Sequence, residues 1–164
     1  MQTRSLKVQS PWLRIARLIS ITGLILSLGS IFTFIVMNAV MGEVPSIESV
    51  YWQRLFVSRI TEVLILPGVG LLVVGAIILS LKQYGFFRNT WISVLQILVV
   101  LIVINSVNIT LLAGRVTEIA VRQWQTSVFI PEYMNLKSAE DIFGAVNVVM
   151  MIICLIVPFY KNEN

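Results

Sequence analysis

Four long apolar runs constrain the fold of this chain more than any other feature of its sequence. They cover about residues 18–40, 60–81, 91–113 and 142–160, with polar pieces between them. A helix needs roughly 20 apolar residues to cross a hydrocarbon core about 30 Å thick, so each run is long enough to span a membrane. The chain is 57% apolar and only 12% charged, which leaves too little polar surface for a water-soluble domain. We therefore expect one all-α domain over residues 1–164, an integral membrane four-helix bundle.

The first run is expected to remain in the mature protein as a membrane anchor. Ser10 and Pro11 predict the start of its helix, because a serine cap followed by proline suits a helix N-terminus. The competing interpretation is a cleaved signal peptide, whose apolar core would cover about 7–15 residues and end at a small-x-small site. The run 18–40 is longer than such a core and ends without that signal.

Small residues recur along the first run at spacings of three, four and three. They are Ser20, Gly23, Ser27 and Ser30. This spacing places them on one helix face, and small residues allow the close packing by which helices associate in a bilayer. We expect a helix contact, with the lining of a narrow pathway as the alternative. Further candidate contact residues are Gly75, Gly144 and Asn147. One hypothesis is that Gly68 and Gly75 face the small residues of the first run.

Charged residues lead directly into the second run, where charge is unfavourable. Arg54, Arg59 and Glu62 precede it, and Glu62 follows Arg59 by about one turn, close enough to pair. A carboxylate at membrane depth is expected to gain a proton or a partner. The residues are typical of an interfacial cluster; the alternative is a functional site for an ion, a proton or an anionic headgroup.

Pro67 and Gly68 lie in the middle of the second run. Proline removes a backbone donor and glycine adds flexibility, so this pair predicts a kink or local unwinding. Broken helices occur at transporter sites, and they also occur where neighbouring helices satisfy the freed carbonyl.

Amide side chains mark the third run. Asn105 and Asn108 are three residues apart and share a helix face. Amides in a bilayer usually bond across helices, contributing roughly 0.6 kcal/mol each, so interhelical bonding is the first interpretation. The second is a polar pocket shared with Glu62, which makes Arg59, Glu62, Asn105 and Asn108 a candidate polar site for an ion or a lipid.

Two features are predicted after the third run. Charged residues at spacings of three and four over 114–126 indicate an amphipathic extension of the helix. Beyond a turn at Pro131, the residues Ser138-Ala139-Glu140-Asp141 resemble an N-terminal cap with acids in the first turn, which predicts that the last helix starts there. Cys154 is the single cysteine, so no intrachain disulfide can form.

Charge asymmetry predicts the orientation. If the N-terminus is inside, the inside pieces hold seven of the twelve basic residues and one of the eight acidic residues. The positive-inside rule then favours both termini on the cytoplasmic side.

No catalytic, cofactor or metal site is predicted. The chain has no histidine and one cysteine, which excludes bis-histidine haem ligation, a Ser-His-Asp triad, histidine-containing zinc or copper sites and iron–sulfur clusters. The glycines at 68, 70 and 75 lack the spacing of a dinucleotide-binding loop. Clustered basic and aromatic stretches of the kind that bind nucleic acid are absent, whereas the basic balance suits anionic lipid headgroups.

The middle half of the chain resembles a family of small proteins. The resemblance is carried by the arginines and acid before the second span, Pro67-Gly68-Val69, Gly75, and Gly85-Phe86-Phe87 leading into Trp91. These features are similar to those of small four-span bacterial membrane proteins of unknown function, loosely related to the copper-resistance D family. The resemblance implies a bacterial inner (plasma) membrane protein. Members commonly carry a histidine in the first span, which this chain lacks, so only the architecture is carried over.

Two functions follow as hypotheses. The first is a non-enzymatic integral membrane protein, a packing or accessory subunit that associates with itself or with other membrane protein subunits. The second is a small carrier or channel with a polar site near the second and third spans. A membrane enzyme acting on lipid or quinone comes third, because the sequence shows no positioned base or nucleophile. Membrane lipids are expected partners in each case.

Overall fold

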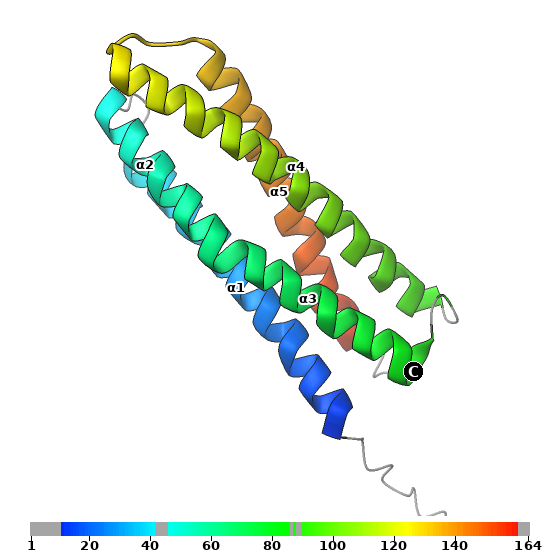
Figure 1. The fold of residues 1–164 in the computed structure, drawn as a ribbon. Coiled ribbons are helices and arrows are strands. Elements are labelled where there is room, and N and C mark those ends of the chain that lie inside the picture. Colours follow the sequence, from blue (N-terminus) through cyan, green and yellow to red (C-terminus); the bar gives the residue numbers. More distant parts are fainter. Residues whose placement is uncertain (1–10, 42–45, 86, 88–89, 161–164) are drawn as a thin grey trace, which may run out of the picture.

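The computed structural model describes residues 11–41, 46–85, 87 and 90–160, and over these ranges the fold is all-α without strands (Figure 1). The elements are α1 (Pro11–Met41), α2 (Ile47–Ile60), the π-helical turn η1 (Thr61–Ile65), α3 (Leu66–Leu79), the π-helical turn η2 (Ser80–Tyr84), α4 (Thr90–Thr126) and α5 (Glu132–Tyr160). From α2 to η2 the chain forms one long helix, so the bundle has four helices. Each is long and apolar enough to cross a membrane. The chain is an integral membrane protein.

The start of α2 follows a local sequence signal, whereas Ser10, the predicted cap of the first helix, lies outside the described residues. Pro11 is the first described residue and is already helical. Ser46 caps α2, with its Oγ accepting a hydrogen bond from the backbone N–H of Ser49 at 3.1 Å. The predicted amphipathic extension, 114–126, is the last part of α4 and continues its helix without a break.

One predicted helix start is wrong. Helix α5 begins at Glu132, so Ser138 lies inside it, more than a turn from its N-terminus. The chain becomes helical directly after Pro131, whose carbonyl accepts the N–H of Met134 at 3.2 Å. Proline favours the first turn of a helix, and Glu132 places an acid there, where it complements the helix dipole. The acidic side chains near Ser138 therefore lie inside the helix, where they can contact other residues instead of capping its start.

Several residues on which the predicted start of the first helix, the charge asymmetry and the resemblance depend lie outside the described residues. They are Arg4, Lys7, Ser10, Glu43, Phe86, Arg88, Lys161 and Glu163.

The helices pack in a fixed order of neighbours. Helix α1 lies along α3, α4 lies along α5, and α2 lies against α4. The larger apolar core joins α1, α3, α4 and α5 and consists of Leu24, Leu28, Val69, Leu72, Ile102, Met151 and Cys154. The smaller core lies at the end where α2, α4 and α5 meet and consists of Val50, Val116, Ala120 and Tyr133. Helix α2 thus packs on α4 and α5 at one end of the bundle, and α1 packs along α3.

The turn between η2 and α4 is held by one amide. Gln96 donates from Nε2 to Ser80 Oγ at 2.7 Å and to the carbonyl of Gly85 at 3.2 Å, and its Oε1 accepts the N–H of Phe87 at 3.0 Å. Gly85 has φ of 75°, a conformation that favours glycine. The three hydrogen bonds of Gln96 therefore fix the hairpin between the second and third membrane helices.

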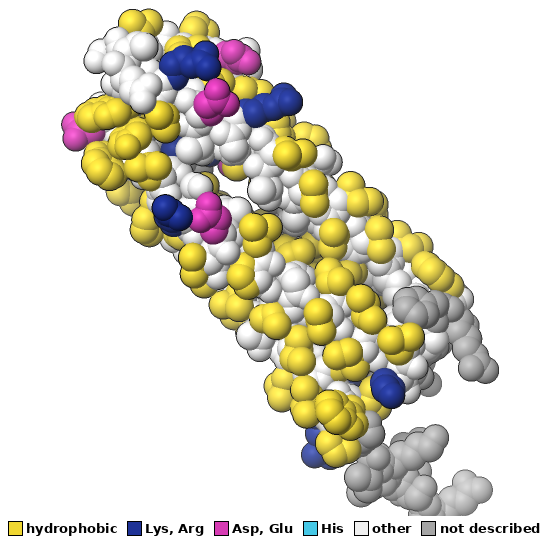
Figure 2. Space-filling view, in the orientation of Figure 1, with side chains coloured by type: hydrophobic (Ala, Val, Ile, Leu, Met, Phe, Trp, Pro, Cys, Tyr) yellow, Lys and Arg dark blue, Asp and Glu magenta, His cyan; other side chains and the backbone are white. Residues whose placement is uncertain are grey.

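The outer surface is apolar along the helices and charged towards the ends. Figure 2 shows hydrophobic side chains covering most of the visible face, with lysine, arginine and acidic side chains gathered at the upper end and basic ones at the lower end. A water-soluble protein would bury such side chains, whereas a lipid bilayer accepts them.

Candidate functional site

The small residues predicted to form a helix contact lie in a tight seam between α1 and α3. A Cβ atom at Gly68 would lie 2.6 Å from Ser27 Oγ and 3.0 Å from the carbonyl of Gly23. A Cβ atom at Gly75 would contact Ser20 Oγ and would lie 2.8 Å from the carbonyl of Ala16. These separations are too short for a side chain. The seam therefore needs glycine, and the structure brings the two sets of small residues together as the hypothesis supposed.

The serine hydroxyls of this seam are mostly used within α1. Ser20 Oγ donates to the carbonyl of Ala16 at 3.1 Å, and Ser30 Oγ donates to that of Leu26 at 2.7 Å. Ser27 Oγ is buried and has no hydrogen-bond partner among the described residues. Ser20 thus presents a small, satisfied surface to Gly75 of α3.

The two candidate contact residues of α5 differ. Asn147 is buried and donates from Nδ2 to Ser106 Oγ of α4 at 3.1 Å, whereas its Oδ1 has no partner within the described chain. Gly144 lies at no close contact, since a Cβ atom there would have no neighbour within 4 Å among the described residues. Asn147 therefore connects α5 to α4, and Gly144 does not take part in a tight seam within this bundle.

The four residues of the candidate polar site are not brought together. Arg59 Nη1 donates to Glu62 Oε2 at 3.0 Å, and both side chains are exposed. Asn105 is buried and donates from Nδ2 to the carbonyl of Phe143 in α5 at 2.8 Å. Asn108 is exposed on α4. The predicted pairing of Arg59 with Glu62 is present, and Asn105 bonds across helices, but within the described part of the chain no hydrogen bond or ion pair joins these two sets of residues.

The backbone before Pro67 is a π-helical turn. The N–H of Leu66 donates to the carbonyl of Thr61, five residues back, in place of the usual four. Pro67 has no N–H to offer the carbonyl of Val63, and its ring would clash with that carbonyl in a regular helix. A widened turn relieves this clash. Gly68 then packs on α1, and the predicted bend of the helix axis stays a prediction.

A buried ion pair connects α2 to α5, and no local sequence pattern indicates this pairing. Arg54 Nη1 lies 2.7 Å from Glu140 Oε2, with side-chain exposures of 5% and 12%. Arg54 Nε also donates to the Tyr133 hydroxyl at 3.3 Å, and its guanidinium lies 5.7 Å from the centroid of that ring. Arg54 is therefore held by two residues of α5, 79 and 86 positions further along the chain.

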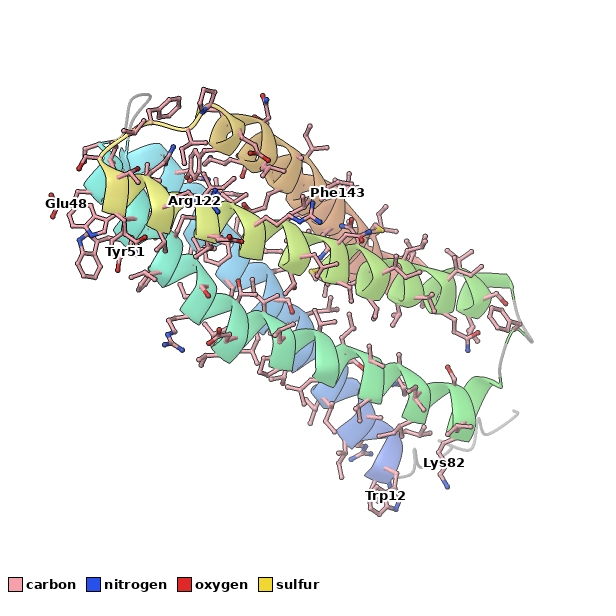
Figure 3. All side chains as sticks on the ribbon, turned by 45° about the horizontal axis from the view of Figure 1, so that its top comes forward. Trp12, Glu48, Tyr51, Lys82, Arg122 and Phe143 are labelled. Atoms are coloured by element: carbon pink, nitrogen blue, oxygen red, sulfur yellow. The ribbon has the colours of Figure 1, made fainter. Side chains whose placement is uncertain are left out.

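Two further contacts reinforce the same end of the bundle. Gln53 Nε2 donates to Asn38 Oδ1 of α1 at 2.5 Å. Tyr51 stacks on Trp124 of α4, with ring centroids 5.3 Å apart and an interplanar angle of 15°. Figure 3 shows Tyr51 at this end together with Glu48 and Arg122, opposite the end that holds Trp12 and Lys82. Aromatic rings at such an end fit a membrane–water boundary.

A groove of about 520 Å³ lies between α3 and α4, where these two helices separate. Its walls are Leu66, Val69, Gly70, Val73 and Val74 of α3, and Val103, Ser106, Val107, Thr110 and Leu111 of α4. The lining is almost entirely apolar. Sequence analysis missed the groove because it depends on the separation of two helices rather than on any local pattern.

The described residues contain no group of three or more histidine, cysteine or acidic side chains placed to hold a metal ion. No family model matches this chain, and no curated protein or solved structure does so either. The resemblance to four-span bacterial proteins therefore stays a prediction.

Proposed function

We propose that this integral membrane protein is a non-enzymatic subunit that associates through the outer face of α1, either with a second copy or with another membrane protein. The observation that carries the proposal is a glycine that lies among large, exposed apolar side chains on the outer face of α1. Ile25, Phe32 and Val36 are 62%, 52% and 61% exposed. Gly29 lies among them at helical spacing, and a Cβ atom there would have no neighbour within 4 Å among the described residues.

A glycine between large apolar side chains suits helix association. Lipid chains are as apolar as leucine, so membrane helices gain little from burying apolar surface and associate where backbones can approach closely. The seam between α1 and α3 illustrates this, because Gly23 on another face of α1 allows contact with Gly68. Gly29 offers a comparable opening to a helix outside the bundle.

The polar side chains at membrane depth also support a structural role. Asn105 and Asn147 bond from one helix to another, and Gln96 fixes a hairpin. A carrier or channel would need polar groups facing a shared pathway. Arg59 and Glu62 instead pair with each other on the surface, so the carrier or channel hypothesis has less support.

Purification from native membranes into nanodiscs tests the proposal. We expect the wild-type chain to travel with a second copy or with larger subunits at a fixed ratio, as measured by native mass spectrometry. Gly29→Leu fills the opening and should separate the complex. Gly114→Leu is the matched control, because Gly114 on α4 is equally open. A wild-type monomer, or an intact complex in Gly29→Leu, would contradict the proposal and favour the carrier or channel hypothesis.

The location and orientation are part of the same proposal: a bacterial inner membrane, with both termini in the cytoplasm. Arg14 and Arg17 near the start of α1 and Lys82 in η2 support this orientation, because these two segments lie at the same end of the bundle (Figure 1), where Figure 2 shows basic side chains and no acidic ones on the visible face. Alkaline phosphatase fused after Asn164 should be inactive and green fluorescent protein at the same position should fluoresce. The reverse pattern would overturn the orientation.

A further inference from the structure

The groove between α3 and α4 has a direction within the membrane. Its α3 wall runs from Leu66, directly after the charged residues of α2 and η1, to Val74 in the middle of the apolar stretch. Its α4 wall runs the opposite way along the chain, from Val103 in the middle of its stretch to Leu111 near the charged extension. Both walls thus extend from the centre of the bilayer to the same charged edge.

The length of the groove matches one leaflet. Leu66 and Val74 are eight residues apart, which corresponds to about 12 Å along a helix. Val103 and Leu111 have the same separation. Half of a hydrocarbon core about 30 Å thick is about 15 Å. A hydrocarbon chain belonging to one leaflet would therefore lie along the groove without crossing the midplane.

The lining favours a hydrocarbon chain over a polar ligand. Its two hydroxyl residues are already bonded inside the protein, since Thr110 Oγ1 donates to the carbonyl of Ser106 at 2.8 Å, and Ser106 Oγ accepts from Asn147 at 3.1 Å. The remaining lining residues are aliphatic or glycine. At Gly70 the helix backbone itself forms part of the wall, and a Cβ atom there would meet nothing within 4 Å among the described residues.

A positive charge lies beyond the charged edge of the groove. Arg115 follows Leu111 by four residues, so it continues the same face of α4 about 6 Å further along the helix axis. Its side chain is exposed, and within the described part of the chain it forms no ion pair. On the α3 side, Arg59 and Glu62 neutralise each other. The mouth of the groove therefore carries one uncompensated cation at the depth of a lipid headgroup.

We propose that the groove is a binding site for an anionic phospholipid, with one acyl chain between α3 and α4 and the headgroup phosphate on Arg115. The apolar lining and the leaflet-long walls fit the acyl chain, and the arginine at the mouth fits the headgroup phosphate. The site does not depend on the association of α1 with a partner, because the two surfaces share no residue.

Lipid retention measured on the full chain tests the site. The protein is placed in nanodiscs of equal parts phosphatidylglycerol and phosphatidylcholine, released into a native mass spectrometer, and stripped of loosely held lipid by mild activation. We expect one retained lipid, with phosphatidylglycerol preferred. Arg115→Gln should lower that preference about fivefold, the effect of one basic residue near a membrane surface. Arg122→Gln is the matched control, since it removes the same charge from an arginine already paired with Glu118.

The apolar part of the site is tested separately. Gly70→Leu places a side chain in the groove and should abolish retention of both lipids, whereas Gly114→Leu should not. Val107→Phe fills the groove from α4 and decides the result if Gly70→Leu alters the circular dichroism spectrum. Three outcomes would overturn the proposal: equal retention of the two lipids by the wild-type protein, unchanged retention in both filled variants, or a retained polypeptide in place of the lipid.

Discussion

The ion pair between Arg54 and Glu140 gives the sharpest prediction about stability. Glu140→Ala removes the carboxylate and leaves the guanidinium of Arg54 in a site where that side chain is only 5% exposed. Removing one partner of a buried pair typically costs about 3–5 kcal/mol, because the remaining charge stays desolvated without compensation. The hydroxyl of Tyr133, 3.3 Å from Arg54 Nε, offers a neutral contact that does not replace the carboxylate. We expect Glu140→Ala to lower the free energy of unfolding by an amount within that range.

The matched control is the exposed pair of Arg122 and Glu118, whose side chains are 63% and 71% exposed and 3.3 Å apart. Glu118→Ala should change the free energy of unfolding by about 0–1 kcal/mol, since water screens the pair and stabilises both charges. The double variant Arg54→Met with Glu140→Leu should be more stable than Glu140→Ala, because it leaves no buried charge.

Unfolding in mixed micelles with increasing fractions of sodium dodecyl sulfate, followed by circular dichroism, measures these differences. A loss in Glu140→Ala no larger than in Glu118→Ala would refute the reasoning, since it would mean that water reaches Arg54 freely. A double variant less stable than Glu140→Ala would also refute it, because the burial of an unpaired charge would then not be the cause.

Three further predictions concern other contacts. Gly75→Ala should destabilise the bundle by about 1–3 kcal/mol in the same assay, because its Cβ would press on the backbone of α1, whereas Gly114→Ala should stabilise α4 by up to about 1 kcal/mol. Asn105→Leu should lower the free energy of unfolding by about 0.6 kcal/mol, because the hydrogen bond to α5 is lost. A decrease above about 2 kcal/mol would indicate a role beyond that bond. Glu62→Gln should alter unfolding by less than about 0.5 kcal/mol and leave ion flux in proteoliposomes unchanged; abolished flux would revive the carrier hypothesis.

Local sequence patterns predicted the features that depend on one helix at a time. Apolar length indicated four spans, and the spacing of Ser20, Gly23 and Ser27 identified one face of α1, because helical periodicity fixes which residues share a face. Glycines at similar spacing on α3 suggested the partner of that face. The pairing of Arg59 with Glu62 followed in the same way from a separation of three residues.

Contacts between distant helices could not be predicted in this way. Arg54 meets Glu140 only because α2 and α5 lie side by side in one particular register, and nothing near either residue sets that register. Glu140 also follows Ser138 in a pattern that resembles a helix start, which predicts an acid in the first turn of a helix rather than a buried partner for Arg54. The polar pocket predicted for Asn105 and Glu62 depends in the same way on contacts between helices, and in the structure Asn105 bonds to α5 while Glu62 pairs with Arg59 on the surface.

The groove shows how one proline affects a site through several steps. Pro67 cannot bond to Val63, and the chain widens into a π-helical turn over Thr61–Ile65. Before that turn the long helix packs on α4, and after it the helix packs on α1 through Gly68. Because the helix changes neighbours at this point, a groove separates α3 from α4 between Leu66 and Val74. Before the turn, the smaller apolar core packs α2 on α4 and the ion pair of Arg54 joins α2 to α5, so the groove is confined to the stretch after the turn.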